Sequence, residues 1–354
     1  MRKLAWLIAI VVAACAAPVP VPSSSPGMPT AGSTNTPSPA VRPTPLVPTA
    51  LPESVRLVHA YPFEPGIMSA AAGWFFGVVT ESDSAATIVR IDPEGTVTRR
   101  RLTDPLVGYF SHAAAQGQAL FIGTSVVARF TSASDELLRV DASTLAVTAR
   151  VALPGAVVAL AADSEGLWVG LADRILRLDP VSLVVPASSA IRGITLPPLG
   201  LASLNVLARG PGGLWATVGD ALHTALYRFD PLSLAVLSRT DVPESGQGIQ
   251  AVAGPESVWI TGEDFARRVD ASGRLSEAVP EAGPQVATAQ GRGLLALVTS
   301  GAVSETLVQI SEGGAVVASS EVGDGGAHLV VDGPDVWLLD GLSLAHWVLV
   351  SPAS

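Results

Sequence analysis

Two histidines occupy the same position in two copies of a repeated sequence pattern, and their side chains could serve one polar site. His112 lies nine residues before Phe121, and His328 lies nine residues before Trp337. The corresponding position of a third copy holds Gln250. Neutral imidazoles combined with a carboxylate bind transition metals, and without a metal such side chains bind polar ligands or line a hydrated channel.

In a fourth copy Val206 holds this position and Asn205 precedes it, while Glu263 and Asp324 could supply carboxylates. We therefore predict a ligand-binding site that consists of His112, His328, Gln250, Asn205, Glu263 and Asp324. We predict no bound metal and no cofactor, because another copy separates the two that carry histidine. A metal site and a merely polar channel lining are the alternatives.

Composition and motifs exclude several classes of function. The chain contains no Gly-x-Ser-x-Gly, His-Glu-x-x-His, Walker or EF-hand string, so we predict no catalytic residue. The formal net charge is −10 and the only lysine is Lys3, which excludes nucleic acid as a partner. Cys15 is the only cysteine, which excludes an intramolecular disulfide and cysteine-based zinc or redox sites.

The elements that must position these residues are short strands in a repeated unit. An apolar pair marks the second strand of each copy, and its second members are Trp74, Phe121, Trp168, Trp215, Trp259, Leu295 and Trp337. Their spacings are 47, 47, 47, 44, 36 and 42 residues. A period in the low-to-mid forties is typical of a β-propeller with four strands in each blade.

A second marker follows each pair. Residues 176–180, Leu-Arg-Leu-Asp-Pro, alternate apolar and polar side chains as a third strand does, and Asp-Pro opens a turn. We place the seventh copy of this marker at residues 348–352. The regular placement favours blade packing by the tryptophans over an aromatic binding box. It likewise favours blade pairing and turn capping by the Arg and Asp residues over charge recognition.

The sequence therefore predicts an all-β fold, a seven-bladed β-propeller over residues 53–354. The last copy ends at its third strand, and a surplus strand at residues 54–60 precedes the first copy. We predict that this N-terminal strand completes the last blade, which closes the ring and removes a free sheet edge.

The longest connections cover residues 123–134, 186–203 and 242–248, on the face where the inner strands begin. Functional residues concentrate in such loops, so we place the site on this face. We interpret the Asp-Pro turns of the opposite face as structural.

The amino terminus has the pattern of an export signal. Residues 1–14 carry Arg2 and Lys3, an apolar run and two alanines before Cys15, a string that resembles the lipobox of bacterial lipoproteins. The resemblance implies cleavage before Cys15 and lipidation of its thiol. Residues 16–52 hold eleven prolines and predict a disordered tether, so that 15–52 would hold an exported head off a membrane. Ordinary secretion with an incidental cysteine is the alternative.

The repeat at residues 163–170, Asp-Ser-Glu-Gly-Leu-Trp-Val-Gly, resembles bacterial exported propellers. It is similar to the sensor-type repeat Asp-x-x-Gly-x-Leu-Trp-x-Gly with one residue fewer, and it looks like the group that includes YVTN-type surface proteins and virginiamycin B lyase. That lyase resemblance implies a metal held by His and Glu near the axis. No contiguous lyase motif carries those residues over to this chain.

These observations favour a binding or scaffold module for a protein, peptide or glycan. We expect it to be a monomer that its lipid anchors outside the cytoplasm. The first alternative is a metal-dependent lyase or hydrolase with its site at the channel mouth. The second is an accessory sensor that passes ligand binding to a membrane partner.

Overall fold

The computed structural model divides the chain into two units, Met1–Leu46 and Val47–Ser354, and every described residue lies in the second. The structure describes residues 55–61, 67–82, 85–102, 109–125, 135–191, 203–219, 223–244, 249–253, 257–262, 265–270, 272–280, 285–288, 293–300, 304–311, 313–323, 328–340 and 343–349. The predicted signal peptide (1–14) and tether (15–52), with Cys15, lie outside these residues.

The described residues form seven sheets of four antiparallel strands each and contain no helix, which confirms the predicted seven-bladed propeller. Blade 1 consists of β2 (Ile67–Ala71), β3 (Trp74–Ser82), β4 (Ala85–Ile91) and β5 (Val97–Leu102). Blade 2 consists of β6 (Tyr109–Gln116), β7 (Ala119–Ser125), β8 (Asp135–Asp141) and β9 (Val147–Leu153). Blade 3 consists of β10 (Val157–Asp163), β11 (Gly166–Leu171), β12 (Arg174–Leu178) and β13 (Ala187–Ala190). Blade 4 consists of β14 (Ser203–Gly210), β15 (Gly213–Gly219), β16 (Thr224–Phe229) and β17 (Val236–Val242).

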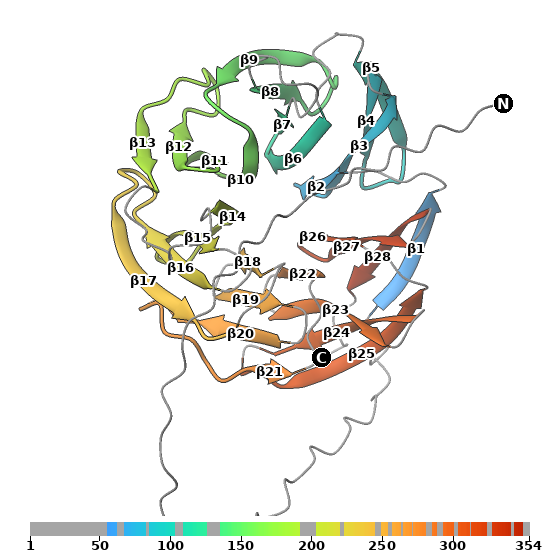
Figure 1. Cartoon of the computed structure of the whole chain (residues 1–354). Helices are drawn as coiled ribbons and strands as arrows, with labels where there is room; N and C mark the ends of the chain where they lie inside the picture. Colours follow the sequence, from blue (N-terminus) through green and yellow to red (C-terminus); the bar gives the residue numbers. More distant parts are fainter. Residues whose placement is uncertain are drawn as a thin grey trace, which may run out of the picture. The chain divides into compact units, whose positions relative to one another are not determined.

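The remaining three blades have the same plan. Blade 5 consists of β18 (Gln250–Ala253), β19 (Val258–Gly262), β20 (Phe265–Val269) and β21 (Val279–Pro280). Blade 6 consists of β22 (Gln285–Thr288), β23 (Leu294–Ser300), β24 (Ser304–Ile310) and β25 (Val316–Gly323). Blade 7 consists of β26 (His328–Asp332), β27 (Asp335–Asp340), β28 (Ser343–Leu349) and β1 (Val55–Tyr61). The inner strands of neighbouring blades contact one another around the whole ring, nearest the axis in Figure 1.

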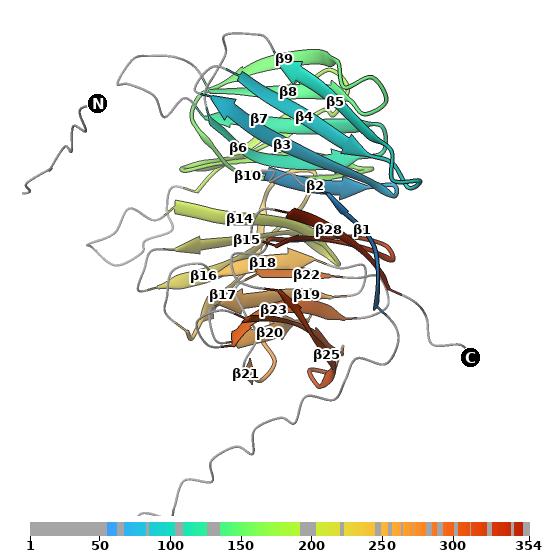
Figure 2. The same cartoon turned by 90° about the vertical axis from the view of Figure 1, so that its right-hand side faces the viewer.

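The N-terminal strand closes the ring as predicted. β1 pairs with β28 from Val55 opposite Leu349 to Tyr61 opposite Leu344, and Figure 2 shows the two strands side by side. Tyr61 is buried and packs near Trp337, whose ring lies 4.8 Å from that of Phe75 in blade 1. Hydrogen bonds therefore join the N-terminal strand to the rest of blade 7, and apolar packing joins blade 7 to blade 1.

The core is distributed over the seams between blades. Each of the seven apolar clusters of described residues draws its side chains from two neighbouring blades. Trp168, Trp215, Trp259 and Trp337 are almost fully buried in these seams, which confirms blade packing as their role. Such burial of large aromatic side chains is a main source of stability in a propeller with no helices to cover its sheets.

The structure corrects the repeat register in two blades. In blade 1 the third-strand Arg90 pairs with Phe76, so Phe76 and not Trp74 matches the tryptophans, and Trp74 lies beneath the Arg90 guanidinium at 4.5 Å. In blade 7 Trp337 pairs with His346, so the marker that we placed at residues 348–352 belongs three residues earlier. The length of each hairpin decides which residues pair, and a constant spacing between sequence markers does not reveal that length.

Candidate functional site

Three of the predicted site residues, His112, Gln250 and His328, share one register on the inner strands. The residues that pair two positions beyond each tryptophan equivalent are Ile67, His112, Ala159, Val206, Gln250, Gln285 and His328. Gln250, Gln285 and His328 belong to the consecutive blades 5, 6 and 7. We missed Gln285 because it lies ten residues before Leu295, one more than in the blades that we aligned. The register thus has three polar positions in a row.

The structure does not bring His112 together with His328. Burial lowers the pKa of the His112 imidazole, and its hydrogen bond to the backbone of Val157 raises it by less. That contact places the ring against the first strand of blade 3, and its Nδ1 has no partner within the described part of the chain. His328 is exposed, and blade 1, with Ile67 at this register, separates it from blade 2. His112 is therefore a neutral residue of a blade seam.

The structure describes little of the other three predicted site residues, Asn205, Glu263 and Asp324. Asn205 is the extra residue of a bulge in β14, between Leu204 and Val206, and its side chain lies outside the description. Glu263 and Asp324 lie outside the described residues altogether. Among the residues that the structure does describe, no group of three or more His, Cys, Asp or Glu side chains could hold a metal ion. The same residues include no helix of the length and hydropathy that a membrane span requires.

The opposite face carries the Asp turns, and their role as caps is confirmed. The Asp141 carboxylate accepts hydrogen bonds from the backbone and hydroxyl groups of Ser143 and Thr144, which lower its pKa from 3.8 to about 2. Hydrogen bonds from the backbone and hydroxyl of Ser182 lower the pKa of Asp179 in the same way. The pKa values of Asp230 and Asp270 are lowered by equivalent bonds. These carboxylates are ionised structural acceptors at neutral pH.

The third-strand arginines of blades 1 and 2 tie each of these blades to the turn of the next. Arg90 of blade 1 donates through Nη1 to the Ala142 and Ser143 carbonyls at 2.9 and 2.6 Å. Arg139 of blade 2 donates through Nε to the Pro180 carbonyl at 3.0 Å. Both blades have phenylalanine at the tryptophan position, and a phenyl ring carries no hydrogen-bond donor.

Blade 3 makes this connection differently. The indole Nε1 of Trp168 donates to the Pro231 carbonyl of blade 4 at 2.9 Å. Arg177, the third-strand arginine of blade 3, instead donates through Nη2 to the Glu165 carbonyl of its own blade at 3.1 Å. Its Nε is buried and has no partner among the described residues. In blade 3 the Trp168 indole therefore makes the bond to the next blade, and Arg177 does not take part in it.

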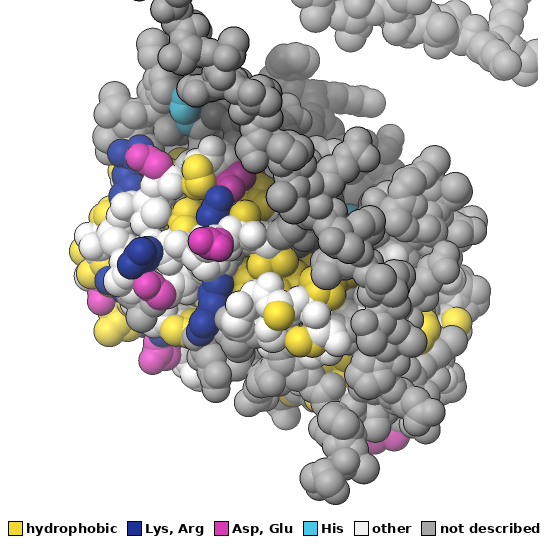
Figure 3. Space-filling model, turned by 90° about the horizontal axis from the view of Figure 1, so that it is seen from below, with side chains coloured by type: hydrophobic (Ala, Val, Ile, Leu, Met, Phe, Trp, Pro, Cys, Tyr) yellow, Lys and Arg dark blue, Asp and Glu magenta, His cyan; other side chains and the backbone are white. Residues whose placement is uncertain are grey.

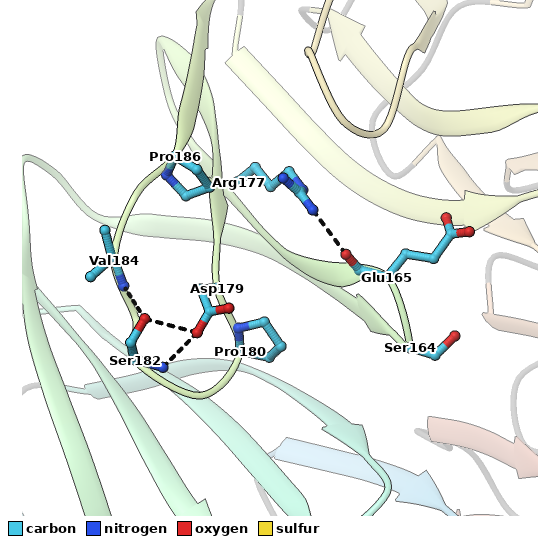
Figure 4. A pocket seen from close by; sticks show the side chains of 8 residues that line it. All are labelled: Ser164, Glu165, Arg177, Asp179, Pro180, Ser182, Val184 and Pro186. Atoms are coloured by element: carbon cyan, nitrogen blue, oxygen red, sulfur yellow. Dashed lines mark hydrogen bonds between the residues drawn. The ribbon is translucent and has the colours of Figure 1, made fainter.

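Arg177 lines a hollow of about 590 Å³ between two turns of blade 3. The hollow is lined by Ser164, Glu165, Arg177, Asp179, Pro180, Ser182, Val184 and Pro186, and Figure 4 shows Arg177 extending toward Glu165 across it. Glu165 forms an ion pair with Arg209 at 2.5 Å, and Arg209 also holds Asp163 at 3.0 Å. The hollow thus combines a guanidinium, two carboxylates and apolar walls.

Exposed apolar side chains lie on blades 3 and 4, and one of them, Val184, lines the hollow. Most of the exposed large apolar residues in the described chain lie in two equivalent segments: Val181, Val184 and Val185, and Leu232, Val236 and Leu237. Val181 is 70% exposed and Leu232 is 56% exposed, although each occupies a turn that is closed by a buried leucine. Figure 3 views the molecule from the side of β17, β21 and β25, where hydrophobic side chains gather among acidic and basic ones. We refer to these six residues as the apolar patch.

Blade 7 contains a buried His–Asp pair that we also missed. His346 occupies the arginine position, stacks on Trp337 with ring centroids 3.9 Å apart, and contacts Asp335 through Nε2 at 2.7 Å. His346 is only 4% exposed. His346 thus takes the place of the third-strand arginine in the blade that closes the ring.

Signals for the hollow were present in the sequence. Valine and leucine directly after Asp-Pro are unusual in a solvent-exposed turn, and residues 181–185 and 232–237 both contain them. The released arginine has no sequence signal, because it depends on which donor reaches the neighbouring blade. Our interpretation of the Asp-Pro turns as structural did not include the hollow beside one of them.

Solved propellers share this fold at low sequence identity. Over 83% of this chain and 99% of that one, BamB from Moraxella catarrhalis aligns with a TM-score of 0.54 and 14% identity. The Pan2 WD40 domain of Neurospora crassa aligns over 87% and 99% with a TM-score of 0.63 and 9% identity. The β-propeller domain of Cps50 (Swd1) from Myceliophteria thermophila aligns over 84% and 100% with a TM-score of 0.60 and 11% identity. No family model and no curated protein matches the sequence. These likenesses show the fold alone.

Proposed function

We propose that this propeller is a scaffold module that binds a protein partner. The observation that carries the proposal is the apolar patch, where six large apolar side chains are exposed on two adjacent blades. Contiguous exposed apolar surface rimmed by polar groups is typical of protein interaction sites. The closed ring supports the proposal, because a rigid surface loses little conformational entropy on binding.

Crosslinking in cells tests this function on the full chain. A photo-crosslinking residue replaces one exposed turn residue at a time in five blades, at Glu94, Ser143, Val181, Leu232 and Ser272. We expect a discrete crosslinked protein from at least one of these positions. Failure of all five positions to capture any protein would contradict the scaffold function.

We further propose that the propeller is exported and anchored by a lipid on Cys15, which would hold it at the outer face of a membrane. The lipobox-like string before Cys15 supports this location, as does the proline-rich segment after it. Mass spectrometry of the purified protein should find an acylated residue 15, and Cys15→Ser should move the protein from the membrane fraction to the soluble fraction. An unmodified Cys15 in the exported protein would remove the anchor.

A further inference from the structure

We propose that the hollow of blade 3, with the adjacent apolar patch, is the docking site for an extended apolar peptide segment that carries one basic side chain. The inference rests on the proposed scaffold function and names its site and the chemistry of its partner. It starts from Arg177, whose equivalents in blades 1 and 2 are used to hold the next turn.

The released guanidinium needs an acceptor. Nε of Arg177 has no partner among the described residues, and the side chain is half-buried beside Trp168 and Gly166. A buried donor without an acceptor costs free energy, so a ligand that supplies an acceptor gains affinity. A main-chain carbonyl of an extended segment provides such an acceptor without adding charge, and polyproline-II segments present carbonyls that are free of internal hydrogen bonds.

The charge of the hollow favours a cation over an anion. The hollow and its rim contain Asp163, Glu165 and Asp179 against Arg177 and Arg209, which leaves one net negative charge. Oε1 of Glu165 and Oδ2 of Asp179 accept no hydrogen bond from the described residues, and the Glu165 side chain is 55% exposed. A lysine or arginine of the partner can bind there, whereas an acidic residue would meet these two carboxylates.

Apolar contacts supply the remaining specificity. Pro180, Pro186 and Val184 form walls of the hollow. The exposed Val181 follows Pro180, and the exposed Leu232 follows Pro231, whose carbonyl binds Trp168 of blade 3. A segment rich in proline, valine and leucine buries these side chains while losing little backbone entropy, because it is extended before it binds.

Binding of a defined peptide tests the proposal. The probe is a rhodamine-labelled peptide with the sequence Pro-Val-Pro-Arg-Pro-Leu-Val and blocked ends, titrated with the full-length chain in detergent and followed by fluorescence anisotropy. Two further peptides replace its arginine by norleucine or by glutamate. We expect saturable binding in the order arginine, norleucine, glutamate. Absence of saturable binding, or tightest binding of the glutamate peptide, would overturn the proposed chemistry.

Variants locate the site. Arg177→Gln should weaken binding about tenfold, since a hydrogen bond from a charged donor is lost, and Arg177→Lys should restore part of the affinity. Val181→Ser and Leu232→Ser should each weaken binding severalfold, whereas Val317→Ser, a control 48% exposed in blade 6, should not. Thermal unfolding of each variant checks that the ring is intact. Unchanged affinity in Arg177→Gln and in both patch variants would place the site elsewhere, even if crosslinking had established a protein partner.

Discussion

A single aspartate position repeats at the ends of the third strands, and it makes the stability of the ring depend on pH. The Asp141 pKa is about 2, below its ordinary 3.8, because hydroxyl and backbone donors bind the ionised carboxylate. A folded-state pKa below the unfolded value means that the stabilisation is complete above the unfolded pKa and is lost as the pH falls. The same direction applies to Asp179, Asp230 and Asp270.

We therefore expect the urea midpoint of unfolding to fall between about pH 5 and about pH 2, the window in which these carboxylates become protonated. Asp141→Asn keeps an oxygen acceptor for the same donors but cannot titrate. Its midpoint should be lower than that of the original chain at neutral pH and should decrease less toward acid. An identical acid profile in Asp141→Asn would show that this turn does not contribute.

We expect the Arg177 guanidinium to replace the Trp168 indole as the donor to blade 4 when the indole is removed. Trp168→Phe removes the bond to the Pro231 carbonyl and recreates the situation of blade 2, where Phe121 accompanies an arginine that binds the next turn. We expect a loss of about 1 kcal/mol in the free energy of unfolding, reduced by a new Arg177 bond.

A double-mutant cycle measures this compensation. Combining Trp168→Phe with Arg177→Gln should cost at least about 0.5 kcal/mol more than the sum of the single changes, in urea unfolding. Trp215→Phe, whose indole binds the Pro211 carbonyl of its own blade, is the matched control and should add independently to Arg177→Gln. Additivity in both cycles would contradict the exchange of donors.

At the scale of the strand, close approach between blades restricts side-chain size. A Cβ at Gly170 of β11 would overlap the Leu204 side chain of blade 4 and lie 3.1 Å from Leu207. Gly170→Ala should therefore lower the free energy of unfolding by about 1–3 kcal/mol, as overpacking does. Gly155→Ala is the control, since a Cβ there meets no atom within 4 Å, and it should change stability by less than about 0.5 kcal/mol. If urea unfolding showed the same loss of stability in both variants, the packing between blades 3 and 4 would accommodate the extra methyl group without strain.

Strand pairing also explains which registers the sequence could predict. Alternation and the aspartate that follows each third strand placed the third strands of blades 2 to 5 correctly, with Arg139, Arg177, Arg228 and Arg268 each opposite the aromatic residue. In blade 1 three consecutive aromatic residues, 74–76, offer competing registers, and only the pairing with Arg90 selects Phe76. In blade 7 the hairpin between β27 and β28 is short, so His346 and not Leu349 lies opposite Trp337, which the sequence markers did not indicate.

At the scale of the whole molecule, β1 carries the closure. Deletion of residues 55–61 leaves the edge of β28 unpaired and removes Tyr61 from the apolar cluster that joins blades 7 and 1. We expect a loss of cooperative unfolding in calorimetry and aggregation in size-exclusion chromatography. Deletion of residues 47–53, an equal length before the strand, is the control and should leave the transition unchanged. A cooperative monomer without residues 55–61 would show that the ring does not need its closing strand.

The sequence by itself determined the number of blades, their order and the closing strand, because period, alternation and turn residues are local properties of the chain. It also placed His112, Gln250 and His328 in one register. Only the tertiary structure decided that His112 lies in a blade seam, that Gln285 joins the register, and that Arg177 is free to line a hollow. Each of these depends on which side chain reaches a neighbouring blade, and neighbouring blades are about forty residues apart in the chain.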